Sequence, residues 1–300
     1  DKKNKTNYMK LLITGGSGAV GKHLQNILPN AIYADSKYDL RDWLAAEDLF
    51  ETYKPTHVVH LAAKVGGIKD NINKPAEYFN DNILINTHIM NMCRMYDVKR
   101  FMGILSTCIY PDSVKSYPMN ENDLFLGPPT STNFSYGYAK RCLAVHIDAH
   151  NKQYKTKYNY LIPCNLYSEY DNFKCKDKMH FVTALLKKIK ESNQELNLLG
   201  TGKPLRQFMY AGDLAKVIKK VIDNDITDSF NVATPENLSI NKMTNIALKT
   251  LNKDLKIKYS NPELDGQFRK DVSSKLMLSY IPNFKFTSFE EGIKKVYNKI

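Results

Sequence analysis

Short apolar runs alternate with segments of helical periodicity along the first half of the chain. The runs are rich in Val, Ile and Leu and only strand-length, as buried parallel strands are. Between them, apolar residues recur every three or four positions, which is typical of helices with one buried face. We expect strands at 10–14, 31–34, 57–62, 101–105 and 158–162, and helices at about 20–28, 43–53, 75–96 and 135–153.

This alternation predicts an α/β fold in which helices cover both faces of a doubly wound parallel sheet, the Rossmann arrangement. The pattern fades after residue 166, although 230–232 predicts one more strand of the same sheet. We therefore expect a smaller, discontinuous C-terminal α/β domain. The expected division is 9–166 with about 208–235 for the sheet domain, about 167–207 with 236–300 for the second domain, and 1–8 as an N-terminal extension.

Composition and charge exclude several classes of protein. The 300 residues are 43% hydrophobic and 25% charged, which excludes wholesale disorder. No apolar stretch approaches the roughly 18 residues of a membrane helix. The net charge of +12 is spread along the chain and by itself indicates a lysine-rich surface. Five cysteines without a CxxC pair argue against disulfides or a zinc site and favour a reducing, cytoplasmic compartment.

A glycine-rich loop follows the first expected strand and opens the first expected helix. Its glycines fit both GxGxxG and GxxGxxG spacing. They allow a tight turn, close approach of the backbone to a pyrophosphate, and close packing of helix on strand. Asp35, twenty residues beyond Gly15, completes the pattern of a dinucleotide-binding unit. The residues expected against the cofactor are Gly15, Gly16, Ser17, Gly18, Ala19, Val20 and Gly21.

Asp35 leaves the choice of dinucleotide open. A carboxylate here suits the ribose diol of NAD and repels the 2′-phosphate of NADP. Lys37 and Arg41 lie close in sequence and would offset that repulsion. A simpler interpretation makes Asp35 a capping residue of a turn.

Tyr136 and Lys140 are spaced Tyr-x-x-x-Lys in an expected helix, so both side chains lie on one face. A neighbouring ammonium favours the phenolate, so we expect Lys140 to lower the pKa of Tyr136 from its usual value of about 10. Such a phenol exchanges protons with a carbonyl/alcohol couple. The spacing is common by chance in a chain with 19 tyrosines. Ser106 strengthens the case, because it ends an expected strand where doubly wound sheets bind ligands.

Longer segments of the chain resemble a known family. The glycine loop, Ser106 and the Tyr136/Lys140 pair resemble the extended short-chain dehydrogenase/reductase superfamily. Within it, the chain from Met9 to about Tyr297 is similar to the GDP-L-fucose synthase family. The segments that carry this similarity are HLAAKVGG (60–67), LSTCIYPD (105–112), GPPTSTNFSYGYAKR (127–141), DNF (171–173), LGTGKPLRQF (199–208) and DGQFRK (265–270).

The resemblance implies an NADPH-dependent enzyme that performs two reactions in one site. It would epimerise GDP-4-keto-6-deoxy-D-mannose at C3 and C5 and then reduce the C4 ketone to give GDP-L-fucose. The sheet domain would bind NADP and the second domain the nucleotide sugar. The resemblance also suggests a homodimer formed through helices around 83–90 and 139–147. It implies no metal, nucleic-acid or membrane partner.

The family's residue roles carry over position by position. Tyr136 would protonate the C4 oxygen, Ser106 would hydrogen-bond the same oxygen, and Lys140 would hold the nicotinamide ribose. Cys108 and His180 match the acid/base pair of the epimerisation. Residues expected along the cofactor are Ile104, Leu105, Ser106, Thr107, Lys140, Pro163, Cys164, Asn165, Leu166 and His180; those expected on the GDP-sugar are Lys188, Leu199, Arg206 and Asp265.

The chemistry agrees with these roles. Protons on carbons beside a ketone are acidic only when the enolate is stabilised, and Tyr136 and Ser106 supply hydrogen bonds to that oxygen. Inversion needs a base on one face and an acid on the other. A thiol of pKa about 8.5 and an imidazole of about 6.5 serve near neutral pH.

Several positions depart from the family pattern or have a simpler interpretation. Cys164 stands where the family commonly has Thr, and Leu199 where it has a Trp near the nucleotide. The glycine loop also lacks the arginine that bacterial members use for the 2′-phosphate. The simpler roles are a core position for Cys108, a helix cap for His180, surface charge for Lys188, a carboxylate contact for Arg206 and a turn for Asp265.

Two other functions stay open from the sequence. An NAD-dependent 4-epimerase or 4,6-dehydratase of the same superfamily would keep NAD bound through its cycle and would need no Cys/His pair. A binding or regulatory protein on the same scaffold would use the basic surface on nucleic acid. The complete set of Ser106, Tyr136 and Lys140 argues against this last function.

Overall fold

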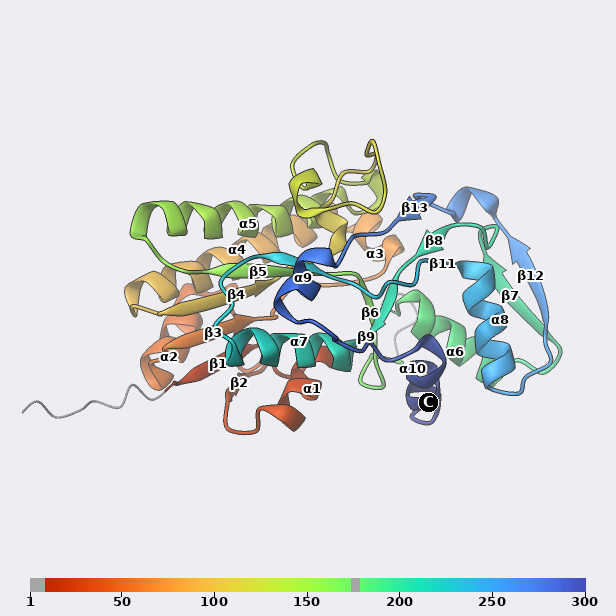
Figure 1. Cartoon of the computed structure of the whole chain (residues 1–300), viewed down its shortest axis with the longest axis horizontal. Coiled ribbons are helices and arrows are strands. Elements are labelled where there is room, and N and C mark those ends of the chain that lie inside the picture. Colours follow the sequence, from red (N-terminus) through yellow and green to blue (C-terminus); the bar gives the residue numbers. More distant parts are fainter. Residues whose placement is uncertain (1–8, 174–178) are drawn as a thin grey trace, which may run out of the picture.

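The computed structural model of the chain describes residues 9–173 and 179–300, and these form two parts (Figure 1). The larger part is a six-stranded sheet between layers of helices. The smaller part, made of short strands and helices, lies beyond one end of the sheet. The expected α/β fold with a parallel sheet is confirmed. The expected extension at 1–8 and Cys175 lie outside the described residues.

The large sheet contains β1 (Leu11–Thr14), β2 (Ile32–Ala34), β3 (His57–His60), β4 (Arg100–Ile104), β5 (Asn159–Pro163) and β10 (Phe230–Val232). Its order is β10-β5-β4-β3-β1-β2, and every neighbouring pair is parallel. The chain places β2 on one side of β1 and then crosses to the other side for β3, β4 and β5. This reversal leaves a crevice beyond the carboxyl ends of β1 and β3, where open α/β sheets bind ligands.

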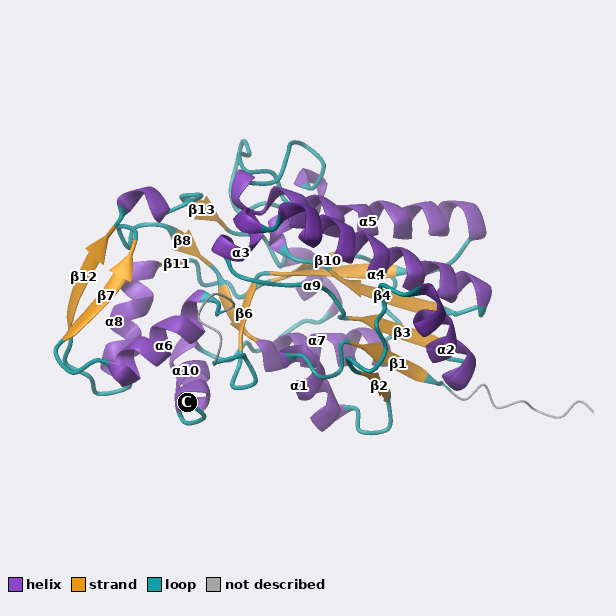
Figure 2. Cartoon of the chain, turned by 180° about the vertical axis from the view of Figure 1, so that it is seen from behind, coloured by secondary structure: helices purple, strands orange, loops and turns teal. Residues whose placement is uncertain are grey.

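Helices cover both faces of this sheet (Figures 1 and 2). On one face α1 (Ala19–Ile27) packs against α7 (Ala211–Asp223). On the other, α4 (Pro75–Met95) packs along α5 (Phe134–Tyr154), and α2 (Trp43–Tyr53) packs against α4. The helices expected from the apolar periodicity are therefore confirmed. A short helix that the periodicity did not predict, α3 (Ile68–Asn73), follows the loop after β3.

The smaller part is assembled from pairs of short strands. β7 (Glu195–Leu199) pairs with β12 (Lys256–Ser260), and β8 (Leu205–Arg206) lies between β11 (Leu238–Ser239) and β13 (Arg269–Lys270). A third pair, β6 (Asn165–Tyr167) with β9 (Phe208–Tyr210), joins the two parts. Its helices are α6 (Phe181–Glu191), α8 (Ile240–Thr250) and α10 (Phe289–Tyr297). In the ranges that the structure describes, no helix has the length and apolar character needed to cross a membrane.

Each part has its own cluster of buried apolar side chains. The second cluster joins α6, α8 and α10 through residues such as Leu186, Met243 and Ile293. The segment after β13 returns to the first cluster, because Val272 and Met277 are buried there and α9 (Lys275–Tyr280) contacts β10. The chain thus crosses between the parts several times, and the residue limits expected for the two domains stay a prediction.

A buried histidine lies at the carboxyl end of β3. The ring of His60 is 2.7 Å from the Thr14 hydroxyl on β1 and 3.1 Å from the Asn86 side-chain oxygen on α4. Burial, followed by the positive charge of Lys140, lowers the pKa of His60 to about 3. His60 is therefore neutral in the folded protein at neutral pH.

We expect His60 to make the folded state less stable in mild acid. Because its folded pKa is depressed from 6.5 to about 3, the unfolded chain binds the extra proton, and stability falls as pH drops from 6.5 towards 3. Between pH 7 and pH 5 this costs about 2 kcal/mol of unfolding free energy. Urea unfolding at both pH values should show that much less pH dependence in His60→Gln than in the wild type; equal dependence would contradict the assignment.

Candidate active site

The glycine loop after β1 is packed backbone against backbone. Gly15 has a φ of +71°, and a Cβ placed on it would lie 2.8 Å from the backbone nitrogen of Ala62 in the loop after β3. A Cβ on Gly21 would lie 2.5 Å from the carbonyl oxygen of Gly16, so α1 also lies directly on the turn. Gly18 caps α1 without a side-chain hydrogen bond, which leaves amide groups of the first turn free for an anion. This cradle fits the pyrophosphate of a dinucleotide.

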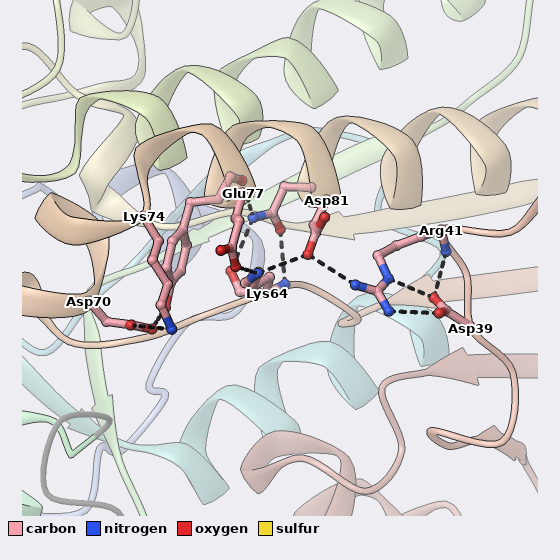
Figure 3. A network of polar contacts seen from close by, with 9 residues as sticks. Asp39, Arg41, Lys64, Asp70, Lys74, Glu77 and Asp81 are labelled. Atoms are coloured by element: carbon pink, nitrogen blue, oxygen red, sulfur yellow. Dashed lines mark hydrogen bonds and ion pairs between the residues drawn. The ribbon is translucent and has the colours of Figure 1, made fainter.

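The carboxylate expected at the ribose is exposed just after β2. Asp35 accepts a hydrogen bond from the backbone nitrogen of Lys37 at 2.9 Å. Arg41 is held by Asp39, at 2.7 Å between Nη2 and Oδ2, and by Asp81 at 3.2 Å (Figure 3). Its charge is thus already matched by two carboxylates. The ammonium of Lys37, the other cation close in sequence, lies 5.4 Å from the centre of the Tyr38 ring.

The same polar network fixes the loop that faces the glycine turn. Lys64 contacts Glu77 at 2.7 Å and Asp81 at 3.0 Å, both on α4 (Figure 3). The side chain of Asn82 bonds both the backbone nitrogen and the carbonyl of Lys64. Exposed ion pairs contribute little to stability by themselves, but Asp81 and Asn82 are buried. The network therefore holds the loop containing Ala62 in position against Gly15.

Ser106, Tyr136 and Lys140 come from two adjoining elements. Ser106 lies two residues beyond the end of β4 and caps a short 3-10 turn at Thr107–Ile109. Tyr136 and Lys140 lie one turn apart on α5. The buried ammonium of Lys140 donates a hydrogen bond to the carbonyl of Ile104 at 2.9 Å. This bond fastens α5 to the end of β4.

The pKa of Tyr136 shifts in the direction opposite to the expected one. Burial raises the pKa of its phenol, and the nearby Cys108 and Tyr78 add to the rise. Burial also lowers the pKa of Lys140 to about 8. The ammonium of Lys140, which was expected to lower this pKa, is bonded to the carbonyl of Ile104. Tyr136 is therefore a protonated phenol at neutral pH.

Cys108 contacts polar groups from both parts of the protein. Its backbone nitrogen donates to the hydroxyl of Ser106 at 3.3 Å, and its sulfur lies 3.4 Å from the ammonium of Lys270 on β13. Burial raises the pKa of the thiol, but the charge of Lys270 and hydrogen bonds from Ser106, Lys270 and Asn133 outweigh it, so the net pKa is lowered. Neither Lys270 nor Asn133 was expected from the sequence to have a role, although both lie in segments that resemble the family.

His180 stands apart from this group. It is the N-cap residue of α6, its side chain is exposed, and it makes no capping hydrogen bond. It interacts electrostatically with Asp171 of the DNF segment. Within residues 9–173 and 179–300, no hydrogen bond or ion pair joins His180 to Cys108 or Tyr136. The structure therefore does not bring the expected acid and base of the epimerisation into contact.

The segment expected beside the nicotinamide links the two parts of the protein. It runs from the end of β5 into β6, where Cys164 is buried and burial raises the pKa of its thiol to about 12. Its backbone nitrogen bonds Val232 of β10. The side chain of Asn165 donates to the carbonyl of Gln207 at 3.0 Å. The side chain of Cys164 is thus packed in the protein interior, and the cofactor contacts expected for 163–166 stay a prediction.

The residues expected on the GDP-sugar all lie in the smaller part. Lys188 donates to the carbonyl of Asn197 at 2.8 Å. Leu199 ends β7 and is 50% exposed. Arg206 donates to the backbone carbonyl of Asp265 at 3.3 Å, so its contact there is with the backbone. The Asp265 carboxylate accepts a hydrogen bond from the backbone nitrogen of Thr201 at 2.6 Å.

Comparison with known proteins identifies the family of the chain. The sequence model of the NAD dependent epimerase/dehydratase family matches residues 11–233, and the chain belongs to that family. Among its relatives are GDP-L-fucose synthases, as the resemblance of its segments predicted. The chain is 34% identical to the GDP-L-fucose synthase of Dictyostelium discoideum, over 97% of this chain and 94% of that protein. It is 31% identical to the probable GDP-L-fucose synthase of Drosophila melanogaster, over 95% and 94% of the two chains.

A solved structure extends the likeness to three dimensions. The GDP-L-fucose synthetase of Naegleria fowleri bound to NADP superposes with a TM-score of 0.88 at 31% identity. The match covers 98% of this chain and 93% of that one, so it includes both parts of the molecule.

We expect Gly15→Ala to lose dinucleotide binding. The substitution forces a Cβ to within 2.8 Å of the Ala62 nitrogen at a φ of +71°, which costs about 1–3 kcal/mol of strain and displaces the loop. Affinity for NADPH, measured by fluorescence titration, should fall at least about tenfold. Gly127→Ala is the matched control, because its nearest neighbour is the Pro111 side chain at 3.3 Å. Equal affinities for both variants would contradict the proposed cradle.

Proposed function

We propose that the protein is a bifunctional enzyme that converts GDP-4-keto-6-deoxy-D-mannose to GDP-L-fucose. The observation that carries this proposal is that the thiol of Cys108, the hydroxyl of Ser106 and the protonated phenol of Tyr136 lie together after β4, in the same parallel sheet whose β1 leads into the glycine loop. The first reaction inverts C3 and C5, and the second reduces the C4 ketone. The relatives in Dictyostelium and Drosophila support the same assignment.

The reduction relies on Tyr136 and Ser106. Because the pKa of Tyr136 is raised, its phenol holds a proton that it gives to the C4 oxygen as negative charge develops there. Ser106 donates a second hydrogen bond to the same oxygen. Lys140 fastens α5 to β4 and would hold the nicotinamide ribose of the bound cofactor.

NADPH is the cofactor of this proposal. The glycine loop and the open first turn of α1 would hold its pyrophosphate, and Lys37 would offset Asp35 at the 2′-phosphate. When bound, NADPH supplies the hydride for the C4 carbon. The NADP-bound Naegleria structure supports this choice.

In the proposed epimerisation, Cys108 is the base and His180 is the acid. Cys108 takes a proton from the carbon beside the ketone, while Ser106 and Tyr136 stabilise the enolate oxygen. His180, exposed at the start of α6, delivers a proton from the opposite side. The same oxygen pocket thus serves both reactions. Lys188, Leu199, Arg206 and Asp265 hold the GDP moiety from the smaller part.

Two variants should separate the reactions. With the keto sugar and NADPH, Tyr136→Phe should lose reduction by about 10²-fold or more, because the proton donor is absent. Cys108→Ser should abolish exchange of C3 and C5 protons with deuterated solvent and keep some reduction, because it leaves Tyr136 in place. Mass spectrometry and NMR of the products measure both. A Cys108→Ser enzyme that exchanges at the wild-type rate would rule out the thiol as base.

The same assay tests the overall function. Wild-type enzyme should consume NADPH and release GDP-L-fucose. Purified protein that carries stoichiometric NAD and consumes no NADPH would instead indicate a 4-epimerase or a 4,6-dehydratase.

We also propose a homodimer formed through α4 and α5. Together these helices line a surface hollow with Ile83, Thr87, Cys142, Val145 and His146. Val145 is 52% exposed there, and exposed apolar residues around a hollow are typical of an interface. Two copies related by a two-fold axis would bury this face.

A charge on this face should separate the subunits. Sedimentation analysis should find Val145→Asp mainly monomeric where the wild type is dimeric, because a carboxylate would be buried without a partner. Leu44→Asp, on α2 and also exposed, is the control and should stay dimeric. A dimeric Val145→Asp protein would place the interface elsewhere.

The cysteines support a reducing, cytoplasmic compartment. Among the residues that the structure describes, Cys93, Cys108, Cys142 and Cys164 are all free thiols. Such a set suits the reducing cytosol.

A further inference from the structure

The side chain of Lys270, in the smaller part of the protein, contacts the thiol of Cys108 in the larger part. It lies on β13, which pairs in parallel with β8 so that Lys270 is opposite Arg206. Paired residues of neighbouring strands direct their side chains to the same face. The ammonium of Lys270 lies 3.4 Å from the sulfur of Cys108, which is 162 residues away in the sequence. At this distance an ammonium strongly favours a thiolate over a thiol.

The backbone of Lys270 is fixed from both sides. Arg269 donates to Asp271 through Nε at 2.6 Å, and its guanidinium lies 4.9 Å from the centre of the Tyr117 ring. The backbone nitrogen of Val272 donates to the side chain of Gln207 at 2.9 Å. Of the two residues of β13, Arg269 is held by Asp271 and Tyr117, whereas Lys270 is directed at the thiol of Cys108.

The other polar groups around Cys108 either favour its thiolate as well or carry no charge. Arg206, on β8, interacts electrostatically with the thiol and adds a second positive charge. Ser106 and Asn133 are hydrogen-bond partners of the sulfur. Tyr136, on α5, also faces Cys108, and it is neutral because its own pKa is raised. Lys270 is therefore the cation in direct contact.

We propose that Lys270 is a positioning residue that holds Cys108 as a thiolate, ready to remove the proton from the carbon next to the ketone of the GDP-sugar. In that step the thiolate becomes a thiol, and the electron pair of the broken C–H bond enters the enolate. Lys270 keeps its proton throughout, and the thiol later returns its own to solvent. This inference rests on the proposed function for its meaning in catalysis, but the thiolate itself is testable without substrate.

The test measures how fast iodoacetamide alkylates Cys108 as pH is varied, with the modified peptide identified by mass spectrometry. In the wild-type enzyme the pH at which alkylation reaches half its maximal rate should lie below the corresponding pH for glutathione, a reference thiol. In Lys270→Met this midpoint should rise by about one pH unit, so that alkylation at pH 7 slows about tenfold. Lys270→Arg should keep most of the wild-type profile. Lys275→Met, which removes an equal charge on α9, is the control and should leave the profile unchanged.

A wild-type midpoint at or above that of glutathione would overturn the proposal, whether or not any variant folds. The same profile in Lys270→Met and wild type would also overturn it. Weakened GDP binding in Lys270→Met with an unchanged alkylation profile would assign Lys270 to the nucleotide instead.

Deuterium exchange into the keto sugar separates this inference from the proposed function. If Lys270 acts through the thiol, Lys270→Met should exchange C3 and C5 protons at least about tenfold more slowly at pH 7, and recover as pH rises. A shifted alkylation profile with unchanged exchange would confirm the thiolate pair and reject Cys108 as the base.

Discussion

The parallel pairing of β1 with β3 and β2 is the constraint on which the site depends. Because the chain reverses its winding direction there, the loops after β1 and β3 emerge side by side at one edge of the sheet. Gly15 lets their backbones touch, and the ion pairs of Lys64 hold the second loop to α4. Ser106 follows β4 at the same edge. The glycine loop and the proposed reactive groups therefore lie at the same edge of one sheet.

Charge is distributed over the site so that each reactive group holds the proton state that its proposed role requires. Tyr136 is half-buried, and desolvation raises the pKa of its phenol, which stays protonated as the proposed donor. Cys108 is half-buried beside Lys270, whose charge favours the thiolate of the proposed base. The pKa values of these two neighbouring acids are therefore shifted in opposite directions. Lys270 contacts the sulfur of Cys108, whereas the ammonium of Lys140 is bonded to the carbonyl of Ile104.

The two parts of the molecule contribute different residues to the proposed chemistry. The sheet supplies the dinucleotide cradle, Ser106, Cys108, Tyr136 and Lys140, whereas the smaller part supplies Lys270 and the groups proposed for the GDP-sugar. Because β13 carries Lys270 across to Cys108, the electrostatics of the base depend on the correct docking of the two parts. Contacts such as Asn165 with Gln207 maintain that docking.

The sequence by itself determined the elements of the sheet, the glycine loop and the Tyr136/Lys140 pair, because these follow from local periodicity and from spacing within one element. Only the tertiary structure decided that Arg41 is bound by two carboxylates, that Lys140 faces a carbonyl, and that Lys270 meets Cys108. The physical reason is that desolvation and Coulomb interactions depend on distances in space. Two-residue strands such as β8 and β13, which set those distances, leave almost no periodic signal in a sequence.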